Sequence, residues 1–366
     1  MLIALYIFFC YTVYVVNMKR IYNKDVFKYF AISRLMLLLG ILIYCLLSST
    51  NIVEIYSYFD NEWYIDIAKN GYSDISVVFF PMIPLIIRYF GIIGCVIINL
   101  ITSYLAGLLI YKLSNLKGSI LWFFSPIAIF SILLYTESIF IFLTILTLYL
   151  YKNKKYLLAG ITLGLSVLTR NMGSMLFFSI FIYMFYYFIK KKIKFKDILI
   201  MYIPATIISL IYPIYLQVKF NNWHIFVDSQ YTYWDRISGN IFSIISDDIN
   251  FMITSTNFFD KFYIIVNFIF LGLMIYFIYK DIRSNKKLTI NSIYMILSIL
   301  AIYSSARSGY NIPSTSFYRY FLGCYPIYLI GSSKDISKNV YNTIFGLFYI
   351  FFIICCILFI SNNFFC

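Results

Sequence analysis

The chain has 366 residues, of which 62% are hydrophobic and only 12% are charged. Soluble domains average about 45–50% apolar and about 25% charged residues, so a soluble core cannot absorb this excess, whereas a bilayer can. The net charge of +14 does not indicate nucleic acid as a partner, because the basic residues are spread through short loops between apolar runs. We therefore expect an all-α, polytopic transmembrane bundle that forms one domain over residues 1–366.

Apolar runs predict where the chain crosses the membrane. A span needs about 20 apolar residues, and fewer when neighbouring helices bury it, which gives about 10–12 spans. They are predicted at 2–17, 29–49, 82–111, 118–134, 137–151, 156–169, 173–189, 197–217, 261–279, 288–306, 320–333 and 340–361. Three short runs also fit tilted, re-entrant or partly crossing segments: 137–151, 156–169 and 320–333. The long run at 82–111 contains Gly91 and Gly94, which favours a break there.

Lys and Arg gather in six clusters, and these predict the orientation of the chain. The clusters lie at 19–28, 112–117, 152–155, 190–196, 280–287 and 334–338. Each falls in an odd-numbered connection, and cytoplasmic connections are the ones that accumulate Lys and Arg. Both termini and the even-numbered connections are therefore expected outside. Two outer loops, 51–81 and 218–260, are long, and long loops in compact proteins are commonly functional.

The first long outer loop is expected to carry an interfacial helix. Asn51 can cap its start and Gly71 can end it. Its apolar residues recur every four positions: Ile55, Phe59, Trp63 and Ile67. A stripe of this kind would rest on the bilayer surface.

The same loop supplies the first candidate for catalysis. Asp60 and Glu62 are carboxylates just outside the membrane and are flanked by aromatic residues, which suits a general base. Trp63 and Tyr64 can stack on sugars or line a lipid groove. The alternative is a solvated acidic loop with no catalytic role.

Two further candidates lie at the outer ends of predicted spans. Arg170, followed by Asn171, stands where the positive-inside rule does not require a cation, and Glu137 lies at the outer end of a neighbouring hairpin. Arg170 can bind a phosphate or pair with Glu137, and ionisable residues at membrane depth are often functional. The alternative is an arginine that only extends its charge to the interface.

The remaining candidates come from later outer loops. Arg319 lies between two tyrosines, of which Tyr320 follows it, and could clamp a phosphate-sugar headgroup. Gln230 and Trp234 belong to an aromatic and hydrogen-bonding stretch of the second long loop that suits carbohydrate. An interfacial aromatic belt and a folded cap on the membrane are the respective alternatives.

Several common sites have no signature in this sequence. There is no P-loop, GxGxxG, GxSxG or HExxH motif and no paired-cysteine zinc spacing. The only histidine is His224, so a histidine-based metal site is not expected. No DxD-type pair lies in a predicted cytoplasmic loop, so a soluble nucleotide-sugar donor has no visible site.

Taken in order, these residues resemble the GPI mannosyltransferase 2 (PIG-V) family of polytopic GT-C class glycosyltransferases. The resemblance covers about residues 56–330, and its pieces are individually short. They are Phe59-Asp60, Trp63-Tyr64, Ile67-Ala68, Gly71-Tyr72, Phe79-Phe80-Pro81, Pro84, Ser125-Pro126, Tyr135-Thr136-Glu137-Ser138, Arg170-Asn171, Gly173, Phe226, Gln230, Trp234, Arg319-Tyr320 and Pro326. Their order, spacing and shared outer location carry the resemblance.

The resemblance implies an inverting transfer of mannose from a polyprenyl-phosphate carrier on the lumenal or extracytoplasmic face. It implies that Asp60 is the general base and that Arg170 and Arg319 stabilise the phosphate. The acceptor would be a glycolipid or glycan hydroxyl, and apolar grooves between spans would hold the lipid tail. A divalent metal on Asp60 and Glu62 is compatible with the sequence, but nothing requires it. Asn61 stands where the family often has Ser.

Two other classes of function remain open at this stage. A transporter or flippase for lipid-linked glycans should place charged residues at mid-membrane on broken helices, whereas here only Arg34 and Arg88 are charged away from the ends of the predicted spans. A non-catalytic scaffold would not require the acids and isolated arginines of the outer face. The short chain and its abundance of residues that are common in AT-rich genomes favour a bacterial source, and hence the bacterial cell membrane. In a eukaryote, the protein would be expected in the membrane of the endoplasmic reticulum.

Overall fold

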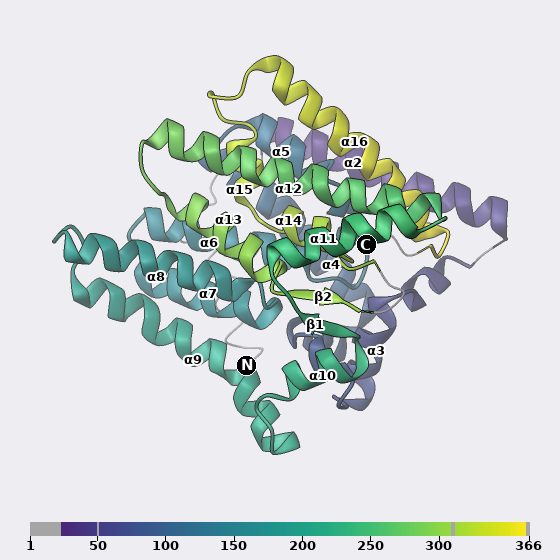
Figure 1. Ribbon diagram of the computed structural model, residues 1–366, viewed down its shortest axis with the longest axis horizontal. Coiled ribbons are helices and arrows are strands. Elements are labelled where there is room, and N and C mark those ends of the chain that lie inside the picture. Colours follow the sequence, from purple (N-terminus) through teal and green to yellow (C-terminus); the bar gives the residue numbers. More distant parts are fainter. Residues whose placement is uncertain (1–22, 50, 309–311, 364–366) are drawn as a thin grey trace.

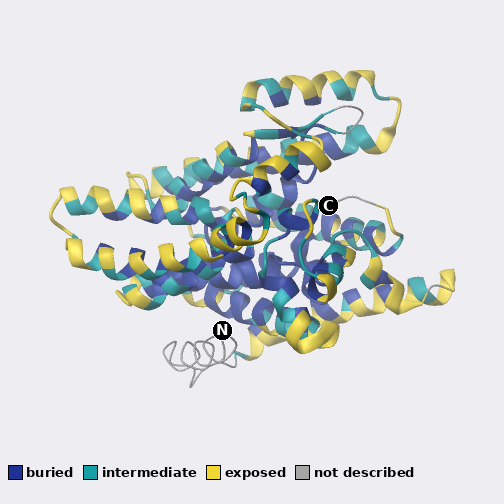
Figure 2. Cartoon of the chain, turned by 90° about the horizontal axis from the view of Figure 1, so that it is seen from below, coloured by how far each residue is buried: buried dark blue, intermediate teal, exposed yellow. Residues whose placement is uncertain are grey.

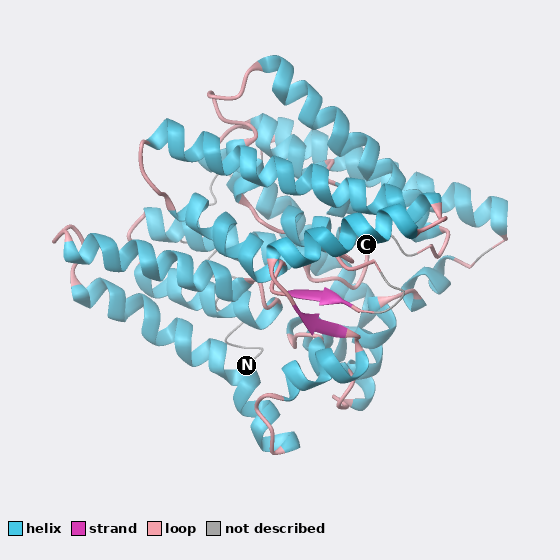
Figure 3. Ribbon diagram, viewed as in Figure 1, coloured by secondary structure: helices cyan, strands magenta, loops and turns pink. Residues whose placement is uncertain are grey.

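The computed structural model describes residues 23–49, 51–308 and 312–363. Within these ranges the chain is almost wholly helical, apart from one two-stranded ribbon (Figures 1 and 3). The predicted helical class is therefore confirmed in its main feature. The predicted span at 2–17 lies outside the described residues.

In the described part, five helices are long and apolar enough to cross a membrane. They are α2 (Lys24–Ser48), α4 (Met82–Leu113), α9 (Phe195–Phe220), α12 (Phe258–Asn285) and α16 (Lys338–Ile360). The pair η4 (Pro126–Ile132) and α6 (Glu137–Lys152) adds a sixth if it counts as one span, although it is bent by 107°. These helices support an integral multi-pass membrane protein, and by length and composition the described residues supply five or six of the ten to twelve expected spans.

Shorter elements fill the space between the long helices and cover one end of them. The helices among these are η2 (Ile52–Ser57), α3 (Asp60–Asn70), η3 (Ser76–Val78), α5 (Leu116–Phe123), α7 (Tyr156–Thr169), α8 (Gly173–Ile189), α10 (Ile225–Tyr233), α11 (Ile241–Thr254), α13 (Ile290–Ile302), α14 (Phe317–Leu322) and α15 (Pro326–Ile330). The ribbon consists of β1 (Arg236–Ser238) and β2 (Ser305–Arg307), which pair antiparallel. It lies beside α10 and joins two outer segments distant in the sequence (Figure 3).

Two predicted spans are not continuous helices and are mostly buried inside the protein; for the run at 320–333, this agrees with the alternative of a segment that crosses only in part. The run at 118–134 is split by Pro126 into α5 and η4, and every residue of η4 is buried. The run at 320–333 is covered by α14 and α15, which have six and five residues and lie in the middle of the bundle (Figure 1). A helix that is apolar all round is as typical of a protein interior as of a span.

The predicted break in the run at 82–111 is confirmed at Gly91 and not at Gly94. Gly91 has φ 71° and ψ −179° inside α4, while Gly94 remains helical. Only glycine adopts this conformation without a steric penalty from a Cβ atom. The break therefore redirects α4 at its outer third.

The predicted interfacial helix of the loop 51–81 is corrected in two respects. The chain forms two helices, η2 and α3, separated at Tyr58 and Phe59, with the expected Asn51 cap on η2 and the expected end of α3 at Gly71. Ile55 and Ile67 are buried in the protein core, so the apolar stripe does not rest on a bilayer surface. The loop packs down onto α4 and forms a wall of the protein interior.

The core is continuous from the outer loops to the opposite end of the bundle. Helices α6, α7 and α9 pack side by side, α6 also lies against α4, and α12 and α16 cross the other side (Figure 1). Dark, buried positions concentrate at the centre, and exposed positions follow the peripheral helices (Figure 2). Exposed apolar residues on α2 and α9, such as Leu47 and Val218, are suited to lipid contact.

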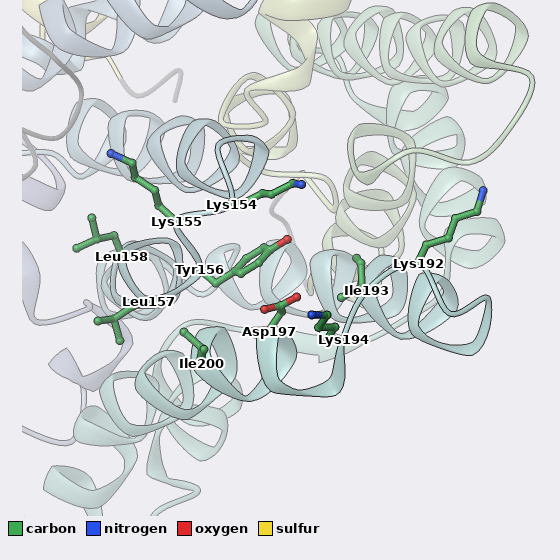
Figure 4. Close-up of a pocket in the computed structure, with 10 residues that line it drawn as sticks. All are labelled: Lys154, Lys155, Tyr156, Leu157, Leu158, Lys192, Ile193, Lys194, Asp197 and Ile200. Atoms are coloured by element: carbon green, nitrogen blue, oxygen red, sulfur yellow. The ribbon is translucent and has the colours of Figure 1, made fainter.

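Five of the six basic clusters meet at one end of the bundle. Lys154, Lys155, Lys192 and Lys194 line one open depression together with Asp197 (Figure 4). Neighbouring clusters are connected by four contacts: Lys112 with Tyr149, Tyr341 with the Lys117 carbonyl, Lys287 with Tyr187, and Lys280 with the Asp335 carbonyl. This segregation of cations agrees with the positive-inside map and leaves the opposite end for the outer loops.

The second long loop folds into a cap that includes a buried acid. Asp248 of α11 has no exposed surface, and its Oδ1 accepts a hydrogen bond from the Ser314 amide at 3.1 Å. Among the described residues, its Oδ2 has no hydrogen-bond partner. Burial raises the pKa of this carboxyl to about 6, from an ordinary value of 3.8. The ionised form is therefore disfavoured in the folded state, and this acid weakens folding as the pH rises from about 4 to about 6.

We expect Asp248→Asn to remove this pH dependence. Relative to the wild type, the variant gains about 2–3 kcal/mol in free energy of unfolding between about pH 4 and pH 7, because Asn keeps the acceptor for Ser314 and carries no charge. Unfolding of both proteins in the same detergent across this range measures the difference. A difference that stays constant with pH would contradict the assignment.

Candidate active site

A cavity of about 650 Å³ lies under the outer loops. Its walls come from α3, the α7–α8 connection, α10, the β ribbon, α13 and α14. The elements that meet here are separated by up to about 260 residues in the sequence, as shown by the contact between Asp60 and Arg319 (259 positions apart). The cavity is therefore a product of the tertiary fold.

The cavity brings together nine of the eleven predicted site residues. They are Asp60, Trp63, Tyr64, Arg170, Asn171, Gln230, Trp234, Arg319 and Tyr320. Glu137 is completely buried and contacts the cavity through two of these residues. Glu62 is exposed on the far side of α3 and does not line the cavity, so the structure offers no contact that supports it as a second catalytic acid.

A network of charged side chains forms one wall of the cavity. Arg319 donates from Nε to Glu137 Oε1 at 2.6 Å and from Nη1 to Asp60 Oδ2 at 3.1 Å. Arg170 donates from Nη1 to the same Glu137 oxygen. These are the three ion pairs among the described residues, and in them two guanidinium groups balance two carboxylates.

Aromatic rings enclose the cations of this network. The Arg319 guanidinium lies 4.7 Å from the centre of the Phe130 ring and 4.8 Å from that of Tyr135, and Arg170 lies 5.2 Å from Tyr320. Burial alone would lower the pKa of Arg319, but Glu137 and Asp60 together raise it well above its ordinary value. Arg319 is therefore permanently charged. Its predicted role in binding a phosphate competes with two carboxylates that it already contacts.

Two of the helices that present this network, α3 and α14, start from a residue with positive φ. Phe59 (φ 52°) precedes Asp60 at the start of α3, and Ser316 (φ 68°) precedes α14, which carries Arg319. Non-glycine residues in this region cost about 1–3 kcal/mol each and are retained where the surrounding structure demands them. Both residues also line the cavity. The strain accompanies the turn that aims Asp60 at Arg319.

Two buried asparagines hold the segment that precedes Glu137. Asn61 donates to the Ile55 carbonyl at 3.1 Å and accepts from the Leu134 amide at 3.0 Å. Asn99 of α4 donates to the carbonyls of Leu133 and Tyr135 at 2.7 and 3.0 Å. Asn61 thus connects the loop of Asp60 to the segment of Glu137.

We expect Asn61→Ala to lower the free energy of unfolding by about 1–3 kcal/mol, because it leaves the buried Leu134 amide without its acceptor and removes one of the two hydrogen bonds to the Ile55 carbonyl. Asn70→Ala on the same helix is the matched control, since Asn70 is exposed and donates only to Asp66. Thermal or denaturant unfolding of the purified protein compares them. Equal stability of the two variants would contradict a connecting role for Asn61.

The opposite wall of the cavity is aromatic. The Trp63 ring stacks on Phe79 with a centroid distance of 5.8 Å and meets Trp234 edge to face at 5.7 Å. Trp234 is fixed by a 3.0 Å hydrogen bond from its indole nitrogen to the Ile75 carbonyl. Rigid aromatic faces beside polar groups such as Gln230 form a surface that can stack on a sugar ring.

An apolar groove lies on the other side of α3. It has a volume of about 440 Å³ and is bounded by α3, α4, α7 and α9. Its lining is almost entirely apolar and includes Ile67, Pro81 and Tyr212; Arg88 is the charged residue in it. Phe80 lines the cavity and packs against Tyr212, which lines the groove, so the two spaces are separated by a thin aromatic partition.

The described residues do not assemble a metal site of the usual kind. No group of three or more His, Cys, Asp or Glu side chains suited to a metal ion occurs among them. The metal pair that the sequence allowed is not formed at the cavity, because Asp60 lines it and Glu62 does not.

Two arginines of the cavity were not among the predicted site residues. Arg236 and Arg307 line it from the β ribbon. In the sequence, both stand as isolated cations in outer connections, which is the property that distinguished Arg170 and Arg319. That signal could have identified them.

No protein-family model, curated protein or solved structure matches this chain.

Proposed function

We propose that the protein is a membrane glycosyltransferase of GT-C type that moves a sugar, most consistently mannose, from a polyprenyl-phosphate donor to a hydroxyl group of a glycolipid or glycan. The observation that carries this proposal is Asp60. Its side chain is 24% exposed, lines a cavity with an aromatic wall, and is oriented by Arg319. A partly exposed carboxylate held by a buried partner is suited to repeated proton transfer.

In the proposed reaction, Asp60 removes the proton of the acceptor hydroxyl. The acceptor oxygen attacks the anomeric carbon while the bond from that carbon to the phosphate oxygen breaks, so the electron pair leaves with the polyprenyl phosphate. One displacement inverts the anomeric configuration. Arg319 keeps Asp60 in position, and Glu137 with Arg170 keeps Arg319 in position. Pre-oriented charges of this kind need little reorganisation during the reaction.

The two spaces suit the two parts of such a donor. The cavity combines aromatic faces with polar side chains, as carbohydrate sites do, and the neighbouring groove is apolar enough for an isoprenoid chain. The basic clusters at the opposite end favour an extracytoplasmic location for the cavity. On this proposal the donor lipid remains in the membrane while its sugar enters the cavity.

The charge distribution distinguishes this proposal from a transporter or flippase. Arg34, one of the two charged residues away from the ends of the predicted spans, is buried and donates to Ser103 Oγ at 2.8 Å, which is a structural contact. Asp60 and four arginines line the cavity under the outer loops: Arg170, Arg236, Arg307 and Arg319. A transport path is expected to place its polar groups near mid-membrane.

Transfer of label in proteoliposomes tests the proposal. Radiolabelled polyprenyl-phosphate-mannose is supplied with extracted membrane lipids as acceptors, and the products are separated by chromatography. Label in a new lipid or glycan supports the enzyme. Label that crosses the bilayer without changing its carrier supports the transporter and would overturn the proposal.

A further inference from the structure

Arg236 and Arg307 are direct cross-strand partners in the β ribbon. Side chains of directly opposed residues project from the same face of an antiparallel pair. Both line the cavity, whereas Ala306, on the alternate face of β2, is buried in the protein. The ribbon therefore presents two guanidinium groups side by side to the cavity.

Within the described part of the chain, neither arginine has an ion-pair partner. No described carboxylate lies within ion-pairing distance of either arginine, and the buried Nε of Arg307 has no hydrogen-bond partner among the described residues. Burial lowers the pKa of Arg307, and the charge of Arg236 lowers it further, while Tyr320, Tyr263 and Asp235 oppose part of this shift. Like charges placed directly opposite each other destabilise a strand pair.

The contrast with the other arginines of the cavity is informative. Arg170 and Arg319 are matched by Glu137 and Asp60, so that part of the wall is neutral. The cavity consequently has a surplus of two positive charges, and both belong to the ribbon. Gln230, Ser304 and Ser305 line the same cavity and offer additional hydrogen-bonding groups.

We propose that Arg236 and Arg307 form an anion site that binds the phosphate group of the lipid-linked donor. This inference rests on the proposed function and changes one part of it, since the phosphate contact moves from Arg170 and Arg319 to the ribbon. Guanidinium groups bind phosphate oxygens through paired N–H donors, so a phosphate between the two arginines relieves their repulsion.

The ribbon also connects two outer segments, one after α10 and one after α13. β1 continues the cap formed by α10, and β2 follows α13. The Ser308 amide donates to the Asp235 carbonyl at 2.9 Å and extends the pairing. A bound phosphate would therefore strengthen the contact between two loops that close the cavity, and part of the binding energy would appear as thermal stability.

The test measures binding directly, without turnover, on the full chain in nanodiscs. The probes are geranyl phosphate, the uncharged alcohol geraniol, and inorganic phosphate at constant ionic strength. The variants are Arg236→Gln and Arg307→Gln, and Lys69→Gln is the control because Lys69 is an exposed outer cation that does not line the cavity. Melting temperature is followed against probe concentration.

We expect geranyl phosphate to stabilise the wild type and the control, and geraniol to have no comparable effect. Either arginine variant should bind geranyl phosphate at least about tenfold more weakly, as expected for loss of a charge-assisted bidentate contact. Without a probe, each variant should melt at the same temperature as the wild type or about 1–2 °C higher, because repulsion within the ribbon is relieved. A merely structural role predicts the opposite change.

The outcomes separate this inference from the proposed function. Unchanged geranyl phosphate binding in both arginine variants overturns the anion site, even if sugar transfer is observed. If geranyl phosphate binding depends on the two arginines but the wild type transfers no sugar, the anion site is supported and the proposed glycosyltransferase activity is refuted. Stabilisation by inorganic phosphate alone, or an arginine-dependent effect of phosphatidylglycerol against phosphatidylcholine nanodiscs, assigns the site to free phosphate or a bilayer headgroup and overturns the donor assignment.

Discussion

Asp60→Asn is expected to reduce sugar transfer by a factor of about 10²–10⁴, the range that general acid–base catalysis contributes. Asparagine retains an oxygen that can accept from Arg319 Nη1, so the geometry of the network is preserved while the proton acceptor is removed. The measurement is the initial rate of label transfer in proteoliposomes with equal amounts of folded protein.

Glu62→Gln is the matched control for this experiment. Glu62 lies two positions away on the same helix but is exposed and outside the cavity. Its substitution should leave the rate within about twofold of the wild type, since it removes no contact to the cavity. A loss of activity in the Glu62 variant together with full activity in the Asp60 variant would assign the base to Glu62 and refute the proposed mechanism.

Glu137→Gln is expected to have the largest effect on stability. Removal of one partner from a buried charge network costs about 3–5 kcal/mol, because the remaining charges stay buried without compensation. Here two guanidinium groups, those of Arg170 and Arg319, share one Glu137 oxygen. Transfer should fall as well, because Arg319 also holds Asp60.

Unfolding of the purified variant in detergent, against wild type and Glu62→Gln, measures this effect. Removal of the exposed Glu62 charge should change the free energy of unfolding by less than about 0.5 kcal/mol. If the Glu137 variant were as stable as the Glu62 control, the network would not hold the site together. The structural basis of the proposed mechanism would then be lost.

The candidate site shows which of its features could be predicted from the sequence and which required the structure. Arg170, Glu137 and Arg319 could be suspected individually, because a charged residue at the outer end of an apolar run needs a reason to be there. Their pairing could not be predicted: Arg319 reaches Glu137 across 182 positions of sequence. The ribbon that places Arg236 opposite Arg307 is only three residues per strand and has no detectable pattern of its own.

The sequence by itself determined that this is a multi-pass membrane protein, which ends of its apolar runs carry the basic clusters, and which polar residues are candidates for chemistry. Each of these follows from the large free-energy cost of placing a charged side chain in a bilayer, which applies to every residue separately and can therefore be read from the sequence. Only the tertiary structure showed which apolar runs of the described residues form long helices and which are broken into short helices inside the protein. Hydropathy records avoidance of water and does not distinguish lipid from protein, so the buried α14 and α15 resembled a span.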